Sequence, residues 1–192
     1  MVISLTKGAS LSLTKPDGSA LTKVRLGLGW DAVKKRGLFG GGGGEIDLDA
    51  SAILFDAKKN VVDMVWYGQL QSRDGSIRHS GDNLTGDGDG DDEQIVVDLS
   101  KVSSTVQSIV LVITSYSRQS FDKIENVFAR VVDLTNGENE VTRYDLANGG
   151  NHTAKIVATI SRAATGWTIK AVGDSANGRT VNDVLNEAQA AI

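Results

Sequence analysis

The 192-residue chain contains no cysteine and a single proline, Pro16. Without cysteine it can form neither a disulfide nor a thiolate metal site. Its two histidines, His79 and His152, lie far apart in the sequence. Structural zinc sites draw on cysteine and histidine, so we do not expect zinc. The absence of cysteine fits a protein of the reducing cytoplasm.

Long hydrophobic segments are also missing. The richest apolar run, residues 109–113, has the length of a strand, whereas about 20 such residues are needed to cross a bilayer. The opening MVISLTKGAS has no basic start, no apolar stretch and no small-residue cleavage site, so we expect no signal peptide. Together these features predict a cytoplasmic protein.

The charge is low overall and unevenly distributed. The formal net charge is −4, which argues against broad nucleic-acid binding. Residues 82–93 contain six acidic residues and no basic one. The acidity of the chain is therefore concentrated in one segment.

Polar and apolar residues alternate with a period of two through much of the chain, and turn signals such as Asp74-Gly75 and Thr165-Gly166 separate the alternating segments. The predicted strands span residues 23–28, 45–50, 53–55, 64–67, 94–99, 107–114, 127–134, 141–146, 154–160 and 166–172. About ten short strands with frequent turns predict an all-β protein built as an antiparallel β-sandwich.

Two segments favour helix instead. Ser120 can cap a short helical turn over residues 121–125, and Thr180 can cap a C-terminal helix. That helix would carry one apolar stripe, formed by Val181, Val184, Leu185, Ala188 and Ile192. Because no linker and no repeat is evident, we predict a single domain over residues 1–192.

The segment GDNLTGDGDGDDE, residues 81–93, indicates a metal site. Its glycines let the backbone curl, so that carboxylate and carbonyl oxygens can converge on one point. Ca²⁺ takes six to eight oxygen ligands in flexible geometry, and Mg²⁺ prefers fewer carboxylates and more water. A solvated acidic loop is the alternative, although apolar strand residues on both sides, Ile77 and 95–97, anchor the ends of the segment.

Known calcium loops do not match this segment. In an EF-hand alignment that starts at Asp87, the required glycine is Asp92, and the flanking segments are strands rather than helices. Acids outside the segment can contribute, because Asp47 and Asp49 lie two positions apart and so share one strand face. An acidic pair on a strand is more often merely exposed to solvent, but next to a metal loop it would complete a second coordination site.

Several motifs resemble the tellurium-resistance (TerD-like) family. They are LGLGWD at 26–31, IDLDAS at 46–51, GDNLTG at 81–86, GDDE at 90–93 and RYDL at 143–146. The resemblance runs in order along nearly the whole chain, and the segment 34–44 resembles an insertion of the longer members. It implies a calcium-binding β-sandwich domain, often with two Ca²⁺ ions at one end, from bacterial stress systems linked to tellurite, phage and colicin resistance.

The resemblance also implies a set of metal ligands. The motif positions place the loop ligands at Asp82, Asn83, Asp91, Asp92 and Glu93. The neighbouring strand ends would supply Asp31, Asp47 and Asp49. Asp89, like Asp87, stands at a variable position of the family loop, where it ligates through its backbone carbonyl or only adds negative charge.

Three functions remain open. The first is a calcium-binding interaction or regulatory module, whose partners would be other proteins of a stress-response complex, with peripheral membrane association as a further option and no nucleic acid. The second is a metal-dependent hydrolase, in which the cations activate water. The third is a structural ion site with the function on another surface. The chain has no Gly-x-Ser-x-Gly or Walker motif, so we expect no enzyme.

Overall fold

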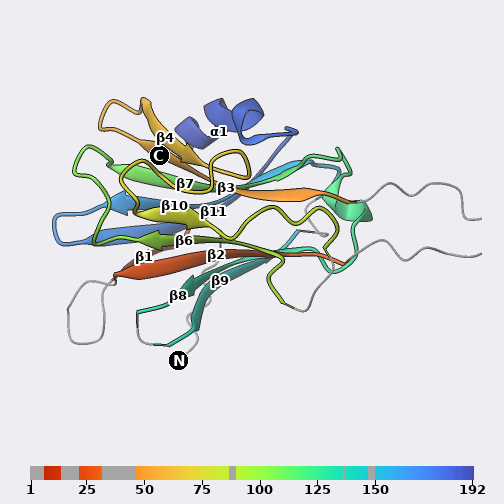
Figure 1. The fold of residues 1–192 in the computed structure, drawn as a ribbon, viewed down its shortest axis with the longest axis horizontal. Helices are drawn as coiled ribbons and strands as arrows, with labels where there is room; N and C mark the ends of the chain where they lie inside the picture. The colour runs from red at the N-terminus through yellow and green to blue at the C-terminus, as the bar shows by residue number, and fades with distance from the viewer. Residues whose placement is uncertain (1–6, 14–21, 32–45, 87–89, 136, 147–149) are drawn as a thin grey trace, which may run out of the picture.

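Two antiparallel sheets lie face to face in the computed structural model, which describes residues 7–13, 22–31, 46–86, 90–135, 137–146 and 150–192 (Figure 1). The first sheet has the strand order β1 (Ser10–Ser12), β11 (Trp167–Ala176), β10 (Ala154–Arg162), β7 (Ser108–Ser115), β3 (Leu48–Phe55) and β4 (Val61–Val65). The second has the order β5 (Ile77–His79), β6 (Glu93–Asp98), β2 (Lys23–Gly29), β8 (Phe128–Asp133) and β9 (Asn139–Asp145). The predicted antiparallel β-sandwich is confirmed.

The strands differ from the prediction in three places. Strand β3 begins at Leu48 and joins the later part of the predicted strand 45–50 to the segment 53–55, because Ser51 and Ala52 continue the ladder to β7. Residue 45 lies outside the described residues. The strand expected at 64–67 begins earlier, at Val61, and ends at Val65. The short strands β1 and β5 have only three residues each, too few for a period of two to be recognised.

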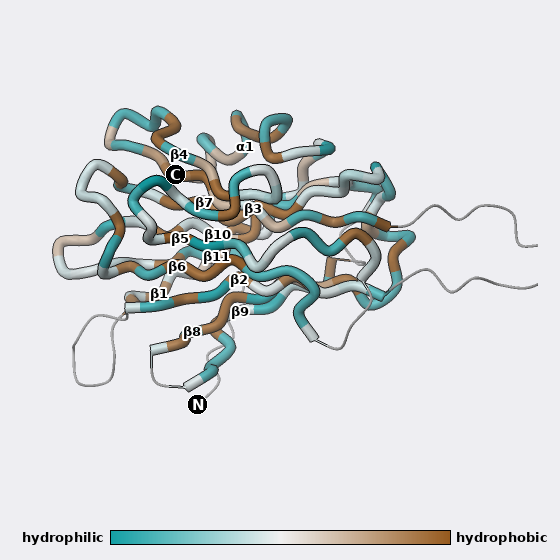
Figure 2. The backbone as a smooth tube through the Cα atoms, viewed as in Figure 1, coloured by the Kyte–Doolittle hydropathy of each residue, from teal (hydrophilic) through white to brown (hydrophobic). Residues whose placement is uncertain are grey.

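The main core lies between the sheets. In β6 buried and half-buried residues alternate along the strand, and Ile95 and Val97 face inward. They pack in one cluster with residues of the opposite sheet such as Leu111 and Ile169. Figure 2 shows that hydrophobic residues are distributed along the strands of both sheets. Alternation thus places the apolar face of each sheet toward the other sheet.

A second cluster covers the outer face of the six-stranded sheet. Two consecutive helices, η3 (Val181–Val184) and α1 (Leu185–Ala190), lie over this face (Figure 1). Val184 and Ala188 pack there against Phe55 and Val112. β3 and β7 are therefore covered on both faces, which explains why nearly all of their residues are buried.

The two predicted helical segments are confirmed, with shorter spans. Thr180 is the N-cap of the C-terminal helical segment, whose first turn is a 3₁₀ helix. The Asp183 carboxylate accepts the Thr180 N–H at 2.9 Å. The turn after Ser120 is the 3₁₀ helix η1 (Phe121–Lys123). Within the described residues, every helix is too short or too polar to traverse a lipid bilayer.

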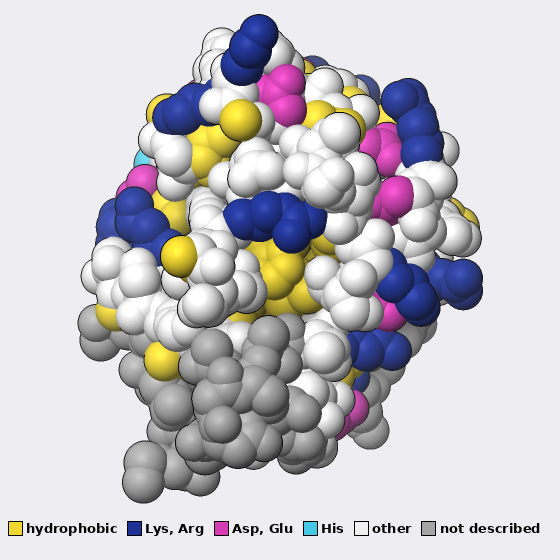
Figure 3. Space-filling model, turned by 90° about the vertical axis from the view of Figure 1, so that its left-hand side faces the viewer, with side chains coloured by type: hydrophobic (Ala, Val, Ile, Leu, Met, Phe, Trp, Pro, Cys, Tyr) yellow, Lys and Arg dark blue, Asp and Glu magenta, His cyan; other side chains and the backbone are white. Residues whose placement is uncertain are grey.

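The beginning of β3 lies at one end of the sandwich, together with the loop that joins β5 to β6 (right-hand side of Figure 1). β4 pairs only with the later part of β3, from Ala52 to Phe55. The edge of β3 before Ala52 is therefore not paired with β4 and is open to contact with the β5–β6 loop. At the opposite end, acidic and basic side chains are interspersed around an apolar area (Figure 3).

Candidate metal centre

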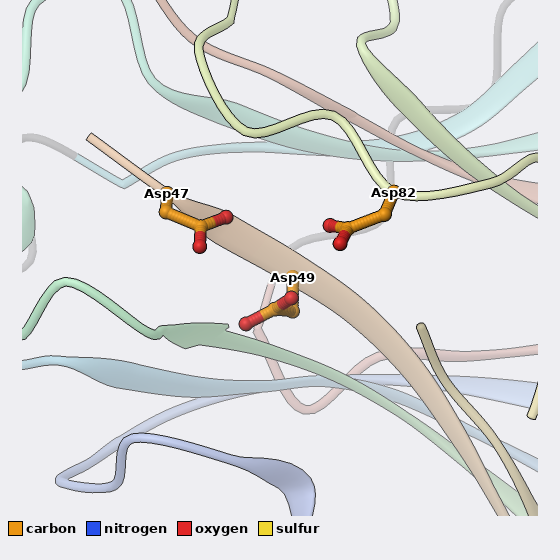
Figure 4. Close-up of side chains that lie close together, drawn as sticks. All are labelled: Asp47, Asp49 and Asp82. Atoms are coloured by element: carbon orange, nitrogen blue, oxygen red, sulfur yellow. The ribbon is translucent and has the colours of Figure 1, made fainter. Parts of the chain in front are cut away.

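Three carboxylates converge at the start of β3. Asp47 directly precedes the strand, Asp49 is its second residue, and Asp82 reaches the same point from the β5–β6 loop (Figure 4). One ligand oxygen from each lies within 4.8 Å of the others. This spacing brings together residues separated by more than thirty positions in the sequence.

The alternation of β3 explains the direction of the first two side chains. Ile46, Leu48 and Ala50 belong to the core between the sheets, so Asp47 and Asp49 point to the other face. The Asp47 carbonyl accepts the backbone N–H of Tyr116 at 2.9 Å, which ties the segment before β3 to the end of β7. The predicted shared face of this acidic pair is thus confirmed.

Burial and mutual repulsion disfavour negative charge at this point. Burial is the largest cause that raises the pKa of Asp49 to about 8, followed by the negative charges of Glu93, Asp47 and Asp82. Burial, Asp82 and Glu93 likewise raise the pKa of Asp47 to about 6, against the opposing charge of Arg179. A cation would stabilise the ionised carboxylates.

Two oxygens of the cluster also lack hydrogen bonds. Asp47 Oδ1 and Asp49 Oδ2 are buried and have no partner among the described residues, and Asp49 is only 2% exposed. An unpaired buried carboxylate oxygen is costly. Hard cations such as Ca²⁺ accept this type of ligand, so the residues present fit a divalent cation.

Glu93 lies beside the cluster, and each of its two carboxylate oxygens already accepts a backbone hydrogen bond. Its side chain is fully buried. Oε2 accepts the Ala50 N–H at 2.8 Å, and Oε1 accepts the Asn83 N–H at 3.1 Å. Glu93 therefore binds the free edge of β3 and the β5–β6 loop at the same time.

His79 completes this arrangement. Its Nδ1 accepts the backbone N–H of Gly81 at 3.0 Å, so the proton of the neutral ring is on Nε2. Nε2 lies 3.2 Å from both Glu93 Oε2 and the Ala50 carbonyl oxygen. His79 thus orients Glu93 and fixes the residue next to Asp82.

Asn83 and Asp92 shape the loop. Asn83 Oδ1 accepts the backbone N–H groups of Thr85 at 3.1 Å and of Gly86 at 3.0 Å, which makes an Asx-type turn. Asp92 Oδ2 accepts the Trp30 N–H at 2.9 Å. Burial is the first cause that raises the pKa of Asp92, although the Trp30 hydrogen bond opposes it.

Asp91 contacts arginines rather than the acidic cluster. Its Oδ1 accepts a hydrogen bond from Arg130 Nε at 2.7 Å, and its Oδ2 lies 3.5 Å from Arg25 Nε. The carboxylate rests against Gly27, where a Cβ atom would overlap it. Glycine at this position of the LGLGWD motif therefore lets the loop lie directly on β2.

The structure describes one of the two remaining predicted ligands, Asp31. Asp31 Oδ2 accepts a hydrogen bond from Asn126 Nδ2 at 2.8 Å. Its charge is close enough to help raise the pKa of Asp92, after burial and Asp91. Asp89 lies outside the described residues. The structure thus groups Asp47, Asp49 and Asp82, and it leaves the other assignments as predictions.

Some residues of this site are not evident from the sequence. Arg25 and Arg130 stand at alternating positions, like ordinary exposed strand residues. Only the fold brings them into contact with Asp91. Arg179 is about 130 positions from Asp47, and no local pattern marks it. His79 has one signal, its position three residues before Asp82.

Comparison with known proteins places the chain in a family. Residues 1–187 match the family model described as the TerD domain. The tellurium resistance protein TerZ of Serratia marcescens is 42% identical over 194 residues, which cover 100% of this chain and 99% of that protein. The stress response protein SCP2 of Bacillus subtilis (strain 168) is also 42% identical, with 97% and 98% covered.

A solved structure supports the fold. The crystal structure of a homologue of telluride resistance protein (TerD) from Streptomyces coelicolor A3(2) superposes with a TM-score of 0.77. The match covers 90% of this chain and 100% of that one at 22% identity. The relatives that match along the whole chain are named as tellurium resistance and stress response proteins. The chain belongs to the TerD family.

Proposed function

We propose that the chain is a Ca²⁺-binding module of a bacterial stress-response system, with the ion held by Asp47, Asp49 and Asp82. The observation that supports this most is the pair of buried, unpartnered oxygens of Asp47 and Asp49 beside the Asp82 carboxylate. Oxygen-only ligands favour Ca²⁺ over a transition metal. A bound ion would neutralise charges that burial otherwise disfavours.

The surrounding residues would act as a scaffold for this ion. Glu93 and His79 hold the loop against β3, and the Asx-type turn of Asn83 sets the path of the chain after Asp82. Asp31 and Asp92, whose charges interact, are the candidates for the second ion that the family resemblance implies. The contribution of Asp89 and Asp91 to either ion remains a prediction.

We infer a binding role rather than an enzymatic one. His79 faces a buried glutamate and a backbone carbonyl instead of the open side of the cluster, so it is poorly placed as a general base for a bound water. Relatives are named as stress response or tellurium resistance proteins. Calcium would order the loop and so create a surface for other proteins of the same cytoplasmic system.

Calorimetric titration of Ca²⁺ into chelator-stripped protein tests this proposal, with Mg²⁺ as the competing ion. We expect Ca²⁺ binding, a weak Mg²⁺ response and a rise in melting temperature, since an ion that binds only the folded state stabilises it by roughly 4 kcal/mol at a thousandfold excess over Kd. Asp49→Asn should weaken binding at least tenfold. The exposed Glu187→Gln removes one charge elsewhere and should leave binding unchanged.

Two results would oppose the proposal. If wild-type protein shows neither heat nor a thermal shift with Ca²⁺, the acidic segment is a solvated charge cluster. If Asp49→Asn and Glu187→Gln bind Ca²⁺ equally well, the ion is held at another place in the chain.

A further inference from the structure

A cavity opens beside the acidic cluster. It has a volume of about 440 Å³ and is lined by Asp47, Leu84, Tyr116, Ser117, Arg118 and Arg179. Asp47 belongs both to this cavity and to the acidic cluster. A ligand in the cavity would therefore lie next to an ion bound by Asp47, Asp49 and Asp82.

Arg179 is held in a fixed position at this cavity. Its Nε donates a hydrogen bond to the Tyr116 carbonyl at 3.0 Å, and its guanidinium carbon lies 3.8 Å from the centre of the Tyr116 ring. Its charge lowers the pKa of Asp47 and Asp49, although burial raises both more strongly. The guanidinium is thus preorganised on the aromatic ring, with its charge directed at the cluster.

Arg118 brings a second positive charge to the cavity. Its backbone has a φ of 60°, in the left-handed region that is uncommon for a residue with a side chain. The Arg118 N–H donates to the Ser115 carbonyl at 3.0 Å, so the chain turns sharply after β7. This turn places Arg118 and Ser117 together in the cavity wall.

A bound Ca²⁺ ion would add two positive charges beside the two arginines and would offset most of the negative charge of Asp47, Asp49 and Asp82. With these carboxylates engaged by the ion, the charge of the two guanidinium groups favours an anion in the cavity. Three carboxylates that each offer one oxygen would also leave part of the coordination shell of Ca²⁺ open, since the ion takes six to eight oxygens. An anion with several oxygens can contact the ion and both guanidinium groups at once.

We propose that this cavity binds a small phosphate monoester, whose oxygens pair with Arg118 and Arg179 and complete the coordination of the Ca²⁺ ion. The inference rests on the proposed calcium site. A phosphate monoester offers three terminal oxygens and a charge near −2, enough for a cation and two arginines. Leu84, which is 52% exposed, and Tyr116 supply an apolar wall for the organic part of the ligand.

A second basic hollow offers a matched control. It has a volume of about 230 Å³, and Lys23, Arg78 and Lys101 are among its lining residues. It contains Asp98 but none of the three clustered aspartates. Arg78→Gln therefore removes the same charge as Arg179→Gln at a site without the cation cluster.

Titration of glycerol 3-phosphate into calcium-loaded and chelator-stripped protein tests the inference. We expect binding to the loaded protein that is at least tenfold weaker without Ca²⁺. Arg179→Gln should weaken glycerol phosphate binding at least tenfold without weakening Ca²⁺ binding, because it removes a positive charge from beside the ion. Arg179→Lys should recover part of the loss, and Arg78→Gln should have no effect.

The outcomes separate the two proposals. If Ca²⁺ binds but glycerol phosphate does not, the anion inference is wrong and the calcium site stands. If glycerol phosphate binds equally with and without Ca²⁺, or if Arg78→Gln matches Arg179→Gln, the assignment to this cavity is overturned. If Ca²⁺ itself does not bind, the calcium proposal fails, and this inference fails with it.

A last comparison identifies the source of the phosphate. Vesicles of phosphatidylcholine with and without phosphatidic acid present the same phosphate monoester on a lipid surface. We expect glycerol 3-phosphate to bind and to compete with any vesicle binding. Binding to phosphatidic acid vesicles with no response to glycerol 3-phosphate would overturn the assignment to a small soluble ligand.

Discussion

The carboxylate of Glu93 accepts the backbone N–H of Ala50 at 2.8 Å, and this hydrogen bond joins β6 of one sheet to β3 of the other. The bond forms where β4 no longer pairs with β3. Glu93 therefore accepts a backbone N–H from the part of β3 that does not pair with β4. It also fixes the position of β3, the strand that carries Asp49. Because its other oxygen accepts the Asn83 N–H, the same side chain also sets the position of the loop that carries Asp82.

Replacement of Glu93 by glutamine should destabilise the protein. The side chain is fully buried, and its oxygens accept N–H groups from Ala50 and Asn83. An amide would direct its own N–H toward one of these donors, which leaves a buried donor unpaired. We expect a loss of about 2 kcal/mol in the free energy of unfolding, measured by urea denaturation in calcium-free buffer.

The control for this experiment is Glu187→Gln. Glu187 is exposed on α1, and its replacement should change the free energy of unfolding by less than about 0.5 kcal/mol. Equal stability of the two variants would mean that the hydrogen bonds of Glu93 contribute nothing to the folded state.

The metal-free protein should lose stability as the pH rises from about 4 to 8. The pKa of Asp47 is raised to about 6 and that of Asp49 to about 8 in the folded protein, whereas both ionise near pH 4 in the unfolded chain. The folded state therefore binds more protons in this window, and stability falls with rising pH. Urea denaturation in calcium-free buffer between pH 5 and 8.5 measures this slope.

Asp49→Asn provides the comparison. Without the titrating carboxylate, the slope should become shallower, and at pH 8 the metal-free variant should be more stable than the wild type by at least about 1 kcal/mol. Saturating Ca²⁺ should reverse the order, because it stabilises only the protein with an intact site. Identical pH slopes in both proteins would show that Asp49 is ionised at no cost in the folded state.

Much of the fold could be predicted because alternation is a local signal. β6 shows it clearly, with Ile95 and Val97 inward and their neighbours half-buried. β7 and the part of β3 from Ala52 on lack clear alternation because both of their faces are covered, so the sequence predicts two segments where β3 is one strand. The pairing order of the strands depends on contacts between distant residues, which no short window of sequence contains.

The candidate site was only partly predictable for a related reason. The acidic residues and their glycines are visible in the sequence, and the shared face of Asp47 and Asp49 follows from the period of a strand. Asp82 belongs to the acidic cluster, whereas Asp91 pairs with Arg130. This difference depends on how the loop crosses β2 at Gly27. A motif records which carboxylates are present but not what each one faces.

Asp82 and Asp91 should therefore respond differently to replacement. Asp82 is exposed and belongs to the acidic cluster, so Asp82→Asn should weaken Ca²⁺ binding at least tenfold with little change in the stability of the metal-free protein. Asp91 is paired with Arg25 and Arg130. Asp91→Asn should lower the free energy of unfolding by about 2 kcal/mol, since it removes the negative charge between these two arginines and leaves Arg25 with Glu138 and Arg130 with Glu140.

Both variants are compared by calorimetry with Ca²⁺ and by urea denaturation without it. If Asp91→Asn abolishes Ca²⁺ binding while the metal-free protein keeps its stability, Asp91 is a ligand, as the family resemblance implies, and its arginine contacts are secondary. If Asp82→Asn binds Ca²⁺ normally, Asp82 is not a ligand.

A crystal structure of the calcium-loaded protein, with anomalous scattering to locate the ion, tests the central proposal most directly. We expect an ion between Asp47, Asp49 and Asp82, with carboxylate oxygens at roughly 2.3–2.6 Å. Density at this point that retains only water, or an ion bound away from all three carboxylates, would contradict the proposed calcium site.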